Sequence, residues 1–389
     1  MRKITVGLIG SGFIADYHVH ALKRVYGLGV YIKSVAGRGN TLDAFAARHF
    51  IENTTTNYRD ILQDPEIDVV DICTPPSLHV SMIKDALNAG KHVICEKPLA
   101  GYFHVEGERD DIGNYVSKRH MYEMVCSEME ELKKVVEASG KLFMYAENWV
   151  YFPSVMKAAE ILRKRPSTIL LIKGEASHSG SHAHHAAWWK FNGGGSFIRN
   201  GCHPLSCAIY LKQLEGRVHG RDIHIKSVVA DMGNVTRLLK DSEKEHIDSR
   251  PVDVEDLGSA ILTFSDDTKA VIISADMMVG GAKDQMEIYT NDAVIKCNAA
   301  PHNGMIGYFA GDRALSDIYM NEKLQDKTGW QAIMANEESE RGFNSEMQDF
   351  MECISSGRSP EAGFNLAQES IKAVYAAYTS AEEGRRIDL

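Results

Sequence analysis

Short apolar runs alternate with helix-periodic segments over the first 147 residues of the chain. Runs of this length, closed by glycine, proline or polar residues, predict buried strands of a parallel sheet. The predicted strands cover residues 4–9, 30–36, 69–73, 91–95 and 141–146. The first helical segment between them ends near Val25. The others cover residues 42–49, 58–62, 77–89 and 121–139. Repeated strand–helix units predict a doubly wound α/β sheet, whose ligands gather at the carboxyl ends of its strands.

The pattern changes after residue 147, because strands then follow one another with short polar turns such as 265–268. Predicted strands cover residues 168–176, 223–232, 258–264, 270–275 and 286–296. Predicted helices cover residues 153–165, 344–355 and 365–383, with one more through Tyr210 and Leu211. Neighbouring strands joined by tight turns are typical of antiparallel pairing. We therefore predict a nucleotide-binding α/β domain over residues 1–147 and an α+β domain with a large, mostly antiparallel sheet over residues 148–389.

Composition narrows the class of protein. A length of 389 residues suits two domains, and the net charge of −10 offers no basic surface for nucleic acid or anionic lipid. The seven cysteines are scattered without a CxxC pair, which argues against a disulfide framework or a zinc ribbon. We see no signal-peptide pattern near the start and no apolar run of about 20 residues. We expect a soluble protein of the cytoplasm that binds neither nucleic acid nor membrane.

A glycine-rich turn follows the first predicted strand, with the pattern GxGxxA. Gly10 permits a tight turn, Gly12 lets a pyrophosphate approach the backbone, and Ala15 allows close packing of helix on strand. The helix that begins at Phe13 and Ile14 directs its first amides at the phosphates. This segment predicts a dinucleotide site.

The end of the second strand bears on the choice of cofactor. A site that prefers NAD usually carries Asp or Glu there, to bind the ribose 2′-hydroxyl. This chain has Gly37 followed by Arg38, within Gly37-Arg38-Gly39-Asn40. A guanidinium beside a position without a carboxylate suits a 2′-phosphate. We expect NAD(P), with a preference for NADP; the alternative is that Arg38 only stacks on the adenine.

The strand over residues 91–95 ends in Glu96-Lys97-Pro98. In a parallel sheet its carboxyl end lies on the same edge as the glycine turn, so Lys97 and a bound dinucleotide face one cleft. The preceding strand ends in Thr74-Pro75-Pro76-Ser77-Leu78-His79, on that same edge. These residues form a candidate active site.

The segments GxGxxA, Thr74-Pro75-Pro76-x-x-His79 and Glu96-Lys97-Pro98 together resemble the Gfo/Idh/MocA family, the relatives of glucose–fructose oxidoreductase and inositol dehydrogenase. The resemblance implies that Lys97 lies beside the nicotinamide and binds the reacting hydroxyl. It also implies that Thr74, Pro75 and His79 line the cofactor, with Glu96 beside it. Glu147-Asn148 resembles the family's hinge, where Asn148 would contact cofactor or substrate and Glu147 would cap or brace.

A second motif follows three consecutive glycines, Gly193-Gly194-Gly195. The family motif here carries Asp and His one helical turn apart, and His203 matches the histidine that acts as general acid/base. The Asp position is occupied by Arg199, which departs from the family pattern. Two alternatives remain open: His203 and Lys97 suffice for the chemistry, or Arg199 holds an anionic or multiply hydroxylated substrate.

Two further segments have open interpretations. Histidines at 178, 182 and 185 lie near Cys202, but no carboxylate or CxxC pair stands at ligand spacing, so we expect no metal. Trp188 and the neighbouring Trp189 provide a stacking platform for a sugar ring or belong to the core. The polar insert over residues 101–122, which includes Glu106 and Glu108, is a lid, a solvated loop or an oligomer contact.

The residues and the resemblance together predict an NAD(P)-dependent oxidoreductase that moves a hydride between nicotinamide and a secondary carbinol of a sugar, cyclitol or related polyol. Lys97 and His203 are the candidate catalytic residues, and Asn148, Trp188 and Arg199 complete the candidate substrate site. One alternative is a glycoside-cleaving enzyme that oxidises its substrate transiently; another is a non-enzymatic cofactor-sensing regulator. The resemblance implies an open-faced second sheet and a homodimer or homotetramer formed through it.

Overall fold

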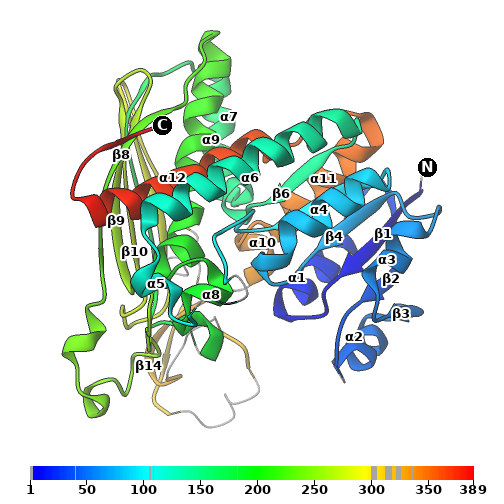
Figure 1. Cartoon of the computed structure of the whole chain (residues 1–389), viewed down its shortest axis with the longest axis horizontal. Helices are drawn as coiled ribbons and strands as arrows, with labels where there is room; N and C mark the ends of the chain where they lie inside the picture. Colours follow the sequence, from blue (N-terminus) through cyan, green and yellow to red (C-terminus); the bar gives the residue numbers. More distant parts are fainter. Residues whose placement is uncertain are drawn as a thin grey trace.

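The computed structural model describes residues 3–39, 41–104, 107, 109–181, 183–298, 305–311, 318–320, 326–334 and 336–389. Two large sheets lie side by side, with helices between and around them (Figure 1). The first sheet is parallel throughout, in the order β3-β2-β1-β4-β5-β6. Its strands are β1 (Lys3–Ile9), β2 (Gly29–Ala36), β3 (Asn53–Thr55), β4 (Val69–Ile72), β5 (His92–Glu96) and β6 (Phe143–Ala146).

This arrangement confirms the predicted doubly wound sheet. The residues of β1 from Ile4 to Ile9 are buried, as expected for a strand covered on both faces. The polar strand β3 was missed, because three residues without an apolar run give no strand signal. The helices of this part are α1 (Phe13–Leu22), α2 (Thr41–His49), α3 (Tyr58–Gln63), α4 (His79–Asn88), α5 (Ile112–Tyr115) and α6 (Lys118–Ser139).

The second sheet has the order β12-β11-β7-β10-β9-β8-β15. Its neighbours are antiparallel except β7 and β10, which confirms a mostly antiparallel sheet. Its strands are β7 (Ile169–Ser177), β8 (Ile225–Gly233), β9 (Leu257–Phe264), β10 (Lys269–Ala275), β11 (Lys283–Thr290), β12 (Val294–Asn298) and β15 (Ile387–Asp388). The single strand predicted over residues 286–296 is wrong: the chain turns at 291–293, and β11 pairs with β12 as a hairpin.

Helices cover one face of this second sheet. They include α7 (Pro153–Lys164), α8 (Trp189–Asn192), α9 (Cys202–His219) and α12 (Phe364–Glu383). Helix α12 packs on β8 and α9 packs on β7, whereas Val229, Ile261 and Ile273 project from the other face and are exposed. A separate hairpin joins β13 (Met305–Phe309) to β14 (Gly329–Ile333).

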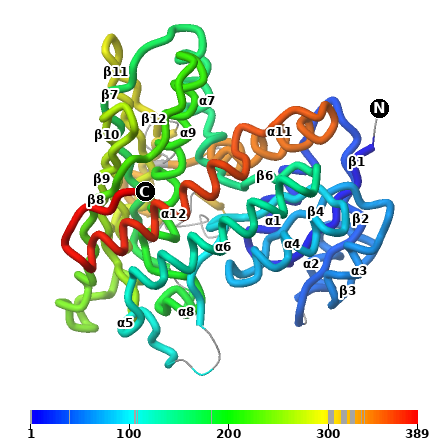
Figure 2. Tube along the Cα trace, turned by 45° about the horizontal axis from the view of Figure 1, so that its top comes forward, coloured from blue at the N-terminus to red at the C-terminus, as the bar shows by residue number. Residues whose placement is uncertain are grey.

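The C-terminal part of the chain returns to the first sheet. Helix α10 (Glu337–Glu340) leads into α11 (Phe343–Ser356), which packs on α1, while α12 runs beside α6 (Figure 2). The Tyr17 and Phe343 rings lie 5.0 Å apart, and the Tyr145 amide donates to the Ala362 carbonyl at 2.9 Å. The predicted boundary after Glu147 lies between β6 and the 3₁₀ turn η2 (Asn148–Tyr151), so the predicted second unit sends α11 back onto the first.

Two features concern the environment of the chain. All seven cysteines are unpaired, and every one except Cys126 is buried. No helix in the described part of the chain combines the length and the apolar character that crossing a membrane requires.

Candidate active site

The glycine turn after β1 is shaped by two different constraints. Gly10 has a φ of +119°, and a Cβ there would lie 2.4 Å from the Cys73 carbonyl oxygen, so only glycine fits. Gly12 has an ordinary φ of −92°, and a Cβ built on it would meet no atom within 4 Å. Ala15 is fully buried where α1 crosses the sheet. The open space at Gly12, in front of the first amides of α1, fits a pyrophosphate.

A side chain at position 37, at the end of β2, would require the Ser11 and Leu42 side chains to move. A Cβ on Gly37 would lie 2.7 Å from the Ser11 hydroxyl oxygen and 2.9 Å from Leu42 Cδ1. The Gly37 amide donates to the Thr55 carbonyl at 3.1 Å, which fixes the backbone there. Arg38 follows in an exposed position, and Asn40 lies outside the described residues.

A cavity of about 190 Å³ lies between the two parts of the molecule. It collects six of the residues predicted for the site: Phe13, Ile14, Glu96, Lys97, Asn148 and His203. Asn148 is held there because its side-chain amide donates to the Arg341 carbonyl at 2.9 Å. Residues from α1, β5, η2 and α9 therefore meet in one place.

The Lys97 side chain is fixed at both ends. Its backbone amide donates to Glu96 Oε2 at 2.9 Å, at the end of β5, and its Nζ donates to the Arg199 carbonyl at 2.8 Å. The Lys97–Pro98 peptide bond is cis. A lysine held in this way presents its remaining N–H groups to the cavity in a defined direction.

His203 is paired with a carboxylate that sequence reasoning treated as a brace. Its Nδ1 lies 2.5 Å from Glu147 Oε1, and its ring stacks on Trp149 at 5.7 Å with 7° between the planes. Glu147 is fully buried, and it also accepts from the Trp149 amide at 3.4 Å as the cap of η2. A bond from Nδ1 to a carboxylate leaves Nε2 as the nitrogen available to the cavity, which suits a general base.

The prediction that Arg199 shares the site with His203 is not borne out by the geometry. Residues Phe197–Gly201 form a π-helical turn, so the α-helical spacing that put both side chains on one face does not apply. Pro204 has no N–H to donate to the Asn200 carbonyl, which favours such an irregular turn. The Arg199 side chain instead pairs with Asp276.

A second cavity, of about 520 Å³, lies behind that turn, and both Arg199 and Trp188 line it. The two predicted substrate residues are therefore separated from Lys97 and His203. Asn200 and His178 take their place in the first cavity, with Asn200 Nδ2 3.0 Å from His178 Nε2. Asn200 also donates to Asp276 Oδ1 at 3.0 Å. Asn200 was missed because the turn was assumed to be α-helical, whereas His178 was considered only as a possible metal ligand.

The three glycines before the π-helical turn lie against a buried acid. A Cβ on Gly195 would lie 2.0 Å from the Glu255 carbonyl oxygen, and the Gly195 amide donates to Glu255 Oε2 at 2.9 Å. The Phe197 amide and the Tyr378 hydroxyl donate to Oε1, each at 2.8 Å. Burial raises the pKa of Glu255 to about 7, although these hydrogen bonds oppose the shift.

His79 lies between the loops that follow β4 and β5. It is fully buried, with Nδ1 2.9 Å from the Pro98 carbonyl and Nε2 2.9 Å from the Thr74 carbonyl. It thus joins the two loops that follow β4 and β5, and burial lowers its pKa. Pro75 is exposed and Thr74 half-buried at the front of that loop. Ser77 does not cap α4, which begins at His79.

The other described features do not line the first cavity. Trp189 is buried against Tyr375 and Tyr378. His182, and Glu106 and Glu108 of the insert, are outside the described residues. The described part of the insert contacts the loop before β9, because the Gly113 amide donates to Asp253 Oδ2 at 2.9 Å.

The family models match two segments of the chain. Residues 4–110 match the model described as "Oxidoreductase family, NAD-binding Rossmann fold", and residues 163–296 match "GFO/IDH/MocA C-terminal domain". Together the two models cover more than half of the chain. Two kinds of similarity to named proteins add to this. Sequence alignments cover about a quarter of the chain at 36–43% identity, and structural alignment covers the whole chain at 20% identity.

Levoglucosan dehydrogenase of Pseudarthrobacter phenanthrenivorans is 43% identical over 107 residues, which are 26% of this chain and 27% of that protein. Inositol 2-dehydrogenase/D-chiro-inositol 3-dehydrogenase of Lactiplantibacillus plantarum is 36% identical over 97 residues, or 24% and 27% of the two chains. The alignments thus span less than a third of these relatives. The structure of GenD2 from gentamicin A biosynthesis, in complex with NAD, has a TM-score of 0.77 at 20% identity and covers 100% of this chain and 97% of that one.

We predict that alanine at the two turn glycines has separable effects. Gly10→Ala should lower the melting temperature, because its Cβ would collide with a backbone carbonyl. Gly12→Ala should leave the melting temperature within about 2 °C of wild type, because its methyl would meet no protein atom. It should weaken NAD(P) binding at least tenfold, because the methyl would occupy the space that we assign to the pyrophosphate. Thermal melts and fluorescence titration with NADH and NADPH measure both. Unchanged cofactor affinity in Gly12→Ala would argue against a pyrophosphate at this turn.

Proposed function

Because this chain belongs to the Gfo/Idh/MocA oxidoreductase family, we propose that it transfers a hydride between an NAD(P) nicotinamide and a secondary carbinol of a sugar, cyclitol or related polyol. The observation that carries the proposal is the meeting of Lys97, from the end of β5, and His203, from α9, in one cavity. The cavity opens at the carboxyl edge of the first sheet, beside the glycine turn. Relatives named as levoglucosan and inositol dehydrogenases support the substrate class.

The cofactor site in this proposal is the edge formed by the turn and the two following loops. Gly10, Gly12 and Ala15 shape the turn, and the amides of Phe13 and Ile14 bind the pyrophosphate. The loops after β4 and β5 flank the nicotinamide end, through Thr74, Pro75 and Glu96, with His79 bracing them from behind and Asn148 facing them from η2. When bound, NAD(P) supplies the hydride acceptor at C4 of its ring.

Lys97, His203 and Glu147 divide the proton chemistry. Lys97 donates a hydrogen bond to the substrate oxygen and polarises it, with its ammonium group anchored on the Arg199 carbonyl. His203 Nε2 accepts the hydroxyl proton as hydride leaves the carbon, and returns it in the reverse direction. Glu147 holds Nδ1 and balances the charge that the imidazole gains. The family motif would place a carboxylate at position 199. In this chain the carboxylate beside His203 comes instead from Glu147, which caps η2.

The cavity wall suits a substrate with several hydroxyl groups. Asn148, Asn200 and His178 line it, and each offers a group that donates or accepts hydrogen bonds. Asp284 lies on the same wall, at the start of β11. Directional polar groups of this kind fix the orientation of a polyol, so that one carbinol faces Lys97 and His203.

For the cofactor itself we propose a preference for NADP. Position 37 carries no acid that would bind a free ribose 2′-hydroxyl, and exposed Arg38 stands next to it. A guanidinium there favours a 2′-phosphate by a charge-assisted hydrogen bond.

For the assembly we propose a homodimer or homotetramer formed through the uncovered face of the second sheet. Val229 lies opposite Ile261, and Ile261 opposite Val271, so an apolar row crosses β8, β9 and β10. Val229 and Ile261 are exposed in the single chain, which a second copy would cover. The unpaired cysteines support the proposal of a reducing compartment, the cytoplasm.

We predict that Lys97→Met lowers kcat by about 100-fold or more, while the dissociation constant for the cofactor changes by less than about threefold. His203→Gln should lower kcat by a factor in the range of about 10² to 10⁴, typical of a lost general base. The matched control is Lys84→Met, a surface lysine paired with Glu131. Absorbance at 340 nm over a panel of polyols and glycosides, with product analysis, measures turnover.

Each result of that panel has a distinct meaning. Unchanged turnover in Lys97→Met would remove this lysine from the mechanism. Glycoside cleavage without net formation of NADH or NADPH would identify the eliminating enzyme in place of the dehydrogenase. Cofactor binding without turnover on any substrate would favour a regulator.

We predict that Arg38→Ala raises the Michaelis constant for NADP at least tenfold and leaves that for NAD within about twofold, because only NADP carries the 2′-phosphate. Steady-state kinetics with both cofactors measure the ratio. A wild-type enzyme with the lower Michaelis constant for NAD would contradict the proposed preference, and Arg38 would then be assigned to the adenine.

We predict that Ile261→Asp reduces the mass in solution to that of one chain, because a carboxylate at the centre of the apolar row is costly to bury. Light scattering coupled to size exclusion measures the mass. Phe50→Asp, at an exposed apolar residue outside the second sheet, is the control. A wild-type monomer, or an Ile261→Asp variant that still associates, would contradict the interface.

A further inference from the structure

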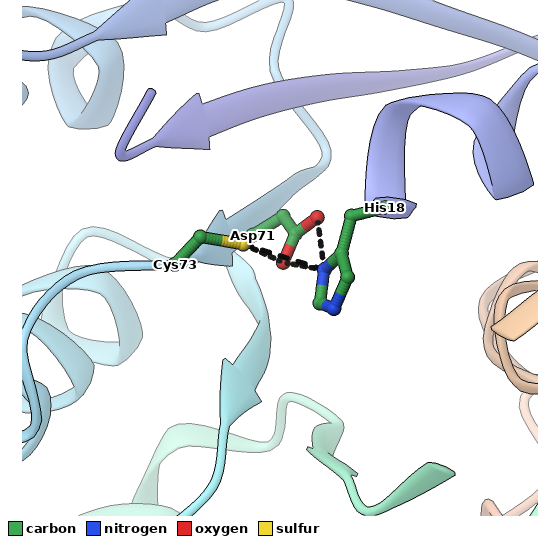
Figure 3. Close-up of side chains that lie close together, drawn as sticks. All are labelled: His18, Asp71 and Cys73. Carbon is green, nitrogen blue, oxygen red and sulfur yellow. Dashed lines mark hydrogen bonds and ion pairs between the residues drawn. The ribbon is translucent and has the colours of Figure 1, made fainter. Parts of the chain in front are cut away.

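A buried histidine lies next to the candidate active site without lining its cavity. His18, in the second turn of α1, is fully buried. Its Nδ1 lies 3.0 Å from each carboxylate oxygen of Asp71, on β4, and 3.3 Å from Cys73 Sγ (Figure 3). Its Nε2 lies 3.1 Å from Glu96 Oε1, at the end of β5. The His18 ring therefore links α1 to two strands of the first sheet, β4 and β5.

Both ring nitrogens of His18 face carboxylate oxygens. A neutral imidazole has one N–H, so one of these contacts would set a lone pair against a carboxylate. The doubly protonated ring donates to both sides. Burial alone lowers the pKa of His18, but the charge of Asp71 and its hydrogen bond outweigh burial and hold that pKa well above its usual value.

Glu96 extends this contact to Lys97. One oxygen of Glu96 accepts from His18 Nε2, and the other accepts from the Lys97 backbone amide at 2.9 Å. The same carboxylate therefore fixes the direction in which the chain leaves β5. Helix α1, which carries His18, begins directly after the Gly12 turn.

We propose that His18 is a positioning residue for Lys97: as a buried cation it holds the Glu96 carboxylate, which fixes the Lys97 backbone, and it ties this point to the helix that begins at the glycine turn. The inference rests on the proposed role of Lys97 in hydride transfer. It adds to that role a mechanical link between the cofactor helix and the catalytic lysine.

The same three side chains have donor atoms suited to a metal ion. His18, Asp71 and Cys73 each place one such atom within 4.8 Å of the others. Burial and the Asp71 charge raise the pKa of the Cys73 thiol, so it is a proton donor to Asp71 rather than a thiolate ligand. A proton on Nδ1 satisfies Asp71 directly. We therefore assign a hydrogen-bonded ion cluster, and bound zinc is an outcome that the test detects.

The balance of charge around Glu96 predicts what removal of His18 does. Burial alone raises the pKa of Glu96, but the hydrogen bond and charge of His18, with Lys97 and His203, lower it overall. The other titratable groups that face this cluster are Asp71, Cys73, His79, Cys95, Tyr145, Glu147 and Glu346. Without the cation, the pKa of Glu96 rises, so Glu96 becomes protonated at a higher pH than in the wild type.

The first test measures the position of Lys97 without relying on catalysis. Pro98 has no amide hydrogen, so a peptide that spans Glu96 to Leu99 reports the Lys97 amide with little overlap in hydrogen–deuterium exchange. We expect His18→Gln to speed exchange at Lys97 at least tenfold, and His20→Gln, on the exposed side of α1, to leave it unchanged. Unchanged protection in a folded His18→Gln protein would overturn the proposal.

Histidine-selective ¹⁵N NMR of the wild-type chain covers the case in which His18→Gln does not fold. We expect one imidazole to stay doubly protonated well above the usual range for histidine. Its signal should be absent from a folded His18→Gln protein and present in His20→Gln. A neutral His18 at pH 7, or stoichiometric zinc by elemental analysis, would overturn the proposal.

The second test follows the pH profile of turnover. In His18→Gln we expect the acidic limb of kcat to move up by at least one pH unit, and Glu96→Gln added to it to return the limb to its wild-type position. Equal profiles in wild type and His18→Gln would overturn the proposal. If exchange at Lys97 responds as expected but the wild type turns over no polyol, the proposed function fails and the positioning role stands.

Discussion

The hydrogen bond from the Lys97 ammonium to the Arg199 carbonyl joins the two sheets at the point where the proposed chemistry occurs. The lysine comes from the edge of the parallel sheet, and the carbonyl comes from an irregular turn at the entry of α9. In a regular α-helix that carbonyl would accept from an amide four residues on. The π-helical turn at Phe197–Gly201 leaves it turned toward Lys97, and Glu255 holds the glycine segment before the turn in place.

Charges below the cavity are grouped around two histidines. Asp71 and Glu96 both contact His18, and Glu147 contacts His203. Glu346, on α11, is buried near both groups with neither carboxyl oxygen hydrogen bonded in the described part of the chain, and burial raises its pKa well above the usual value. A neutral acid at that place avoids a further negative charge beside these three carboxyl groups, which would be costly in a dry interior.

Local patterns in the sequence were sufficient for the parallel sheet, the glycine turn and the placement of Lys97, because strand order and the carboxyl edge follow from repeated strand–helix units. The family resemblance, and not local pattern, pointed to His203 and Asn148. The pairing of Glu147 with His203 joins residues 56 positions apart and has no local signature. The expectation that Arg199 and His203 lie on one helix face assumed helical spacing where the backbone forms a π-helical turn. The contacts of His18 have no local signature either, since its partners lie on two later strands.

The return of α11 onto α1 has a consequence for how the molecule can move. The chain crosses between the sheets at Glu147, again where α10 leads into α11, and once more between α11 and α12. The two parts are therefore joined by several lengths of chain and not by one. Any separation of Lys97 from the Arg199 carbonyl would have to move all of these connections together.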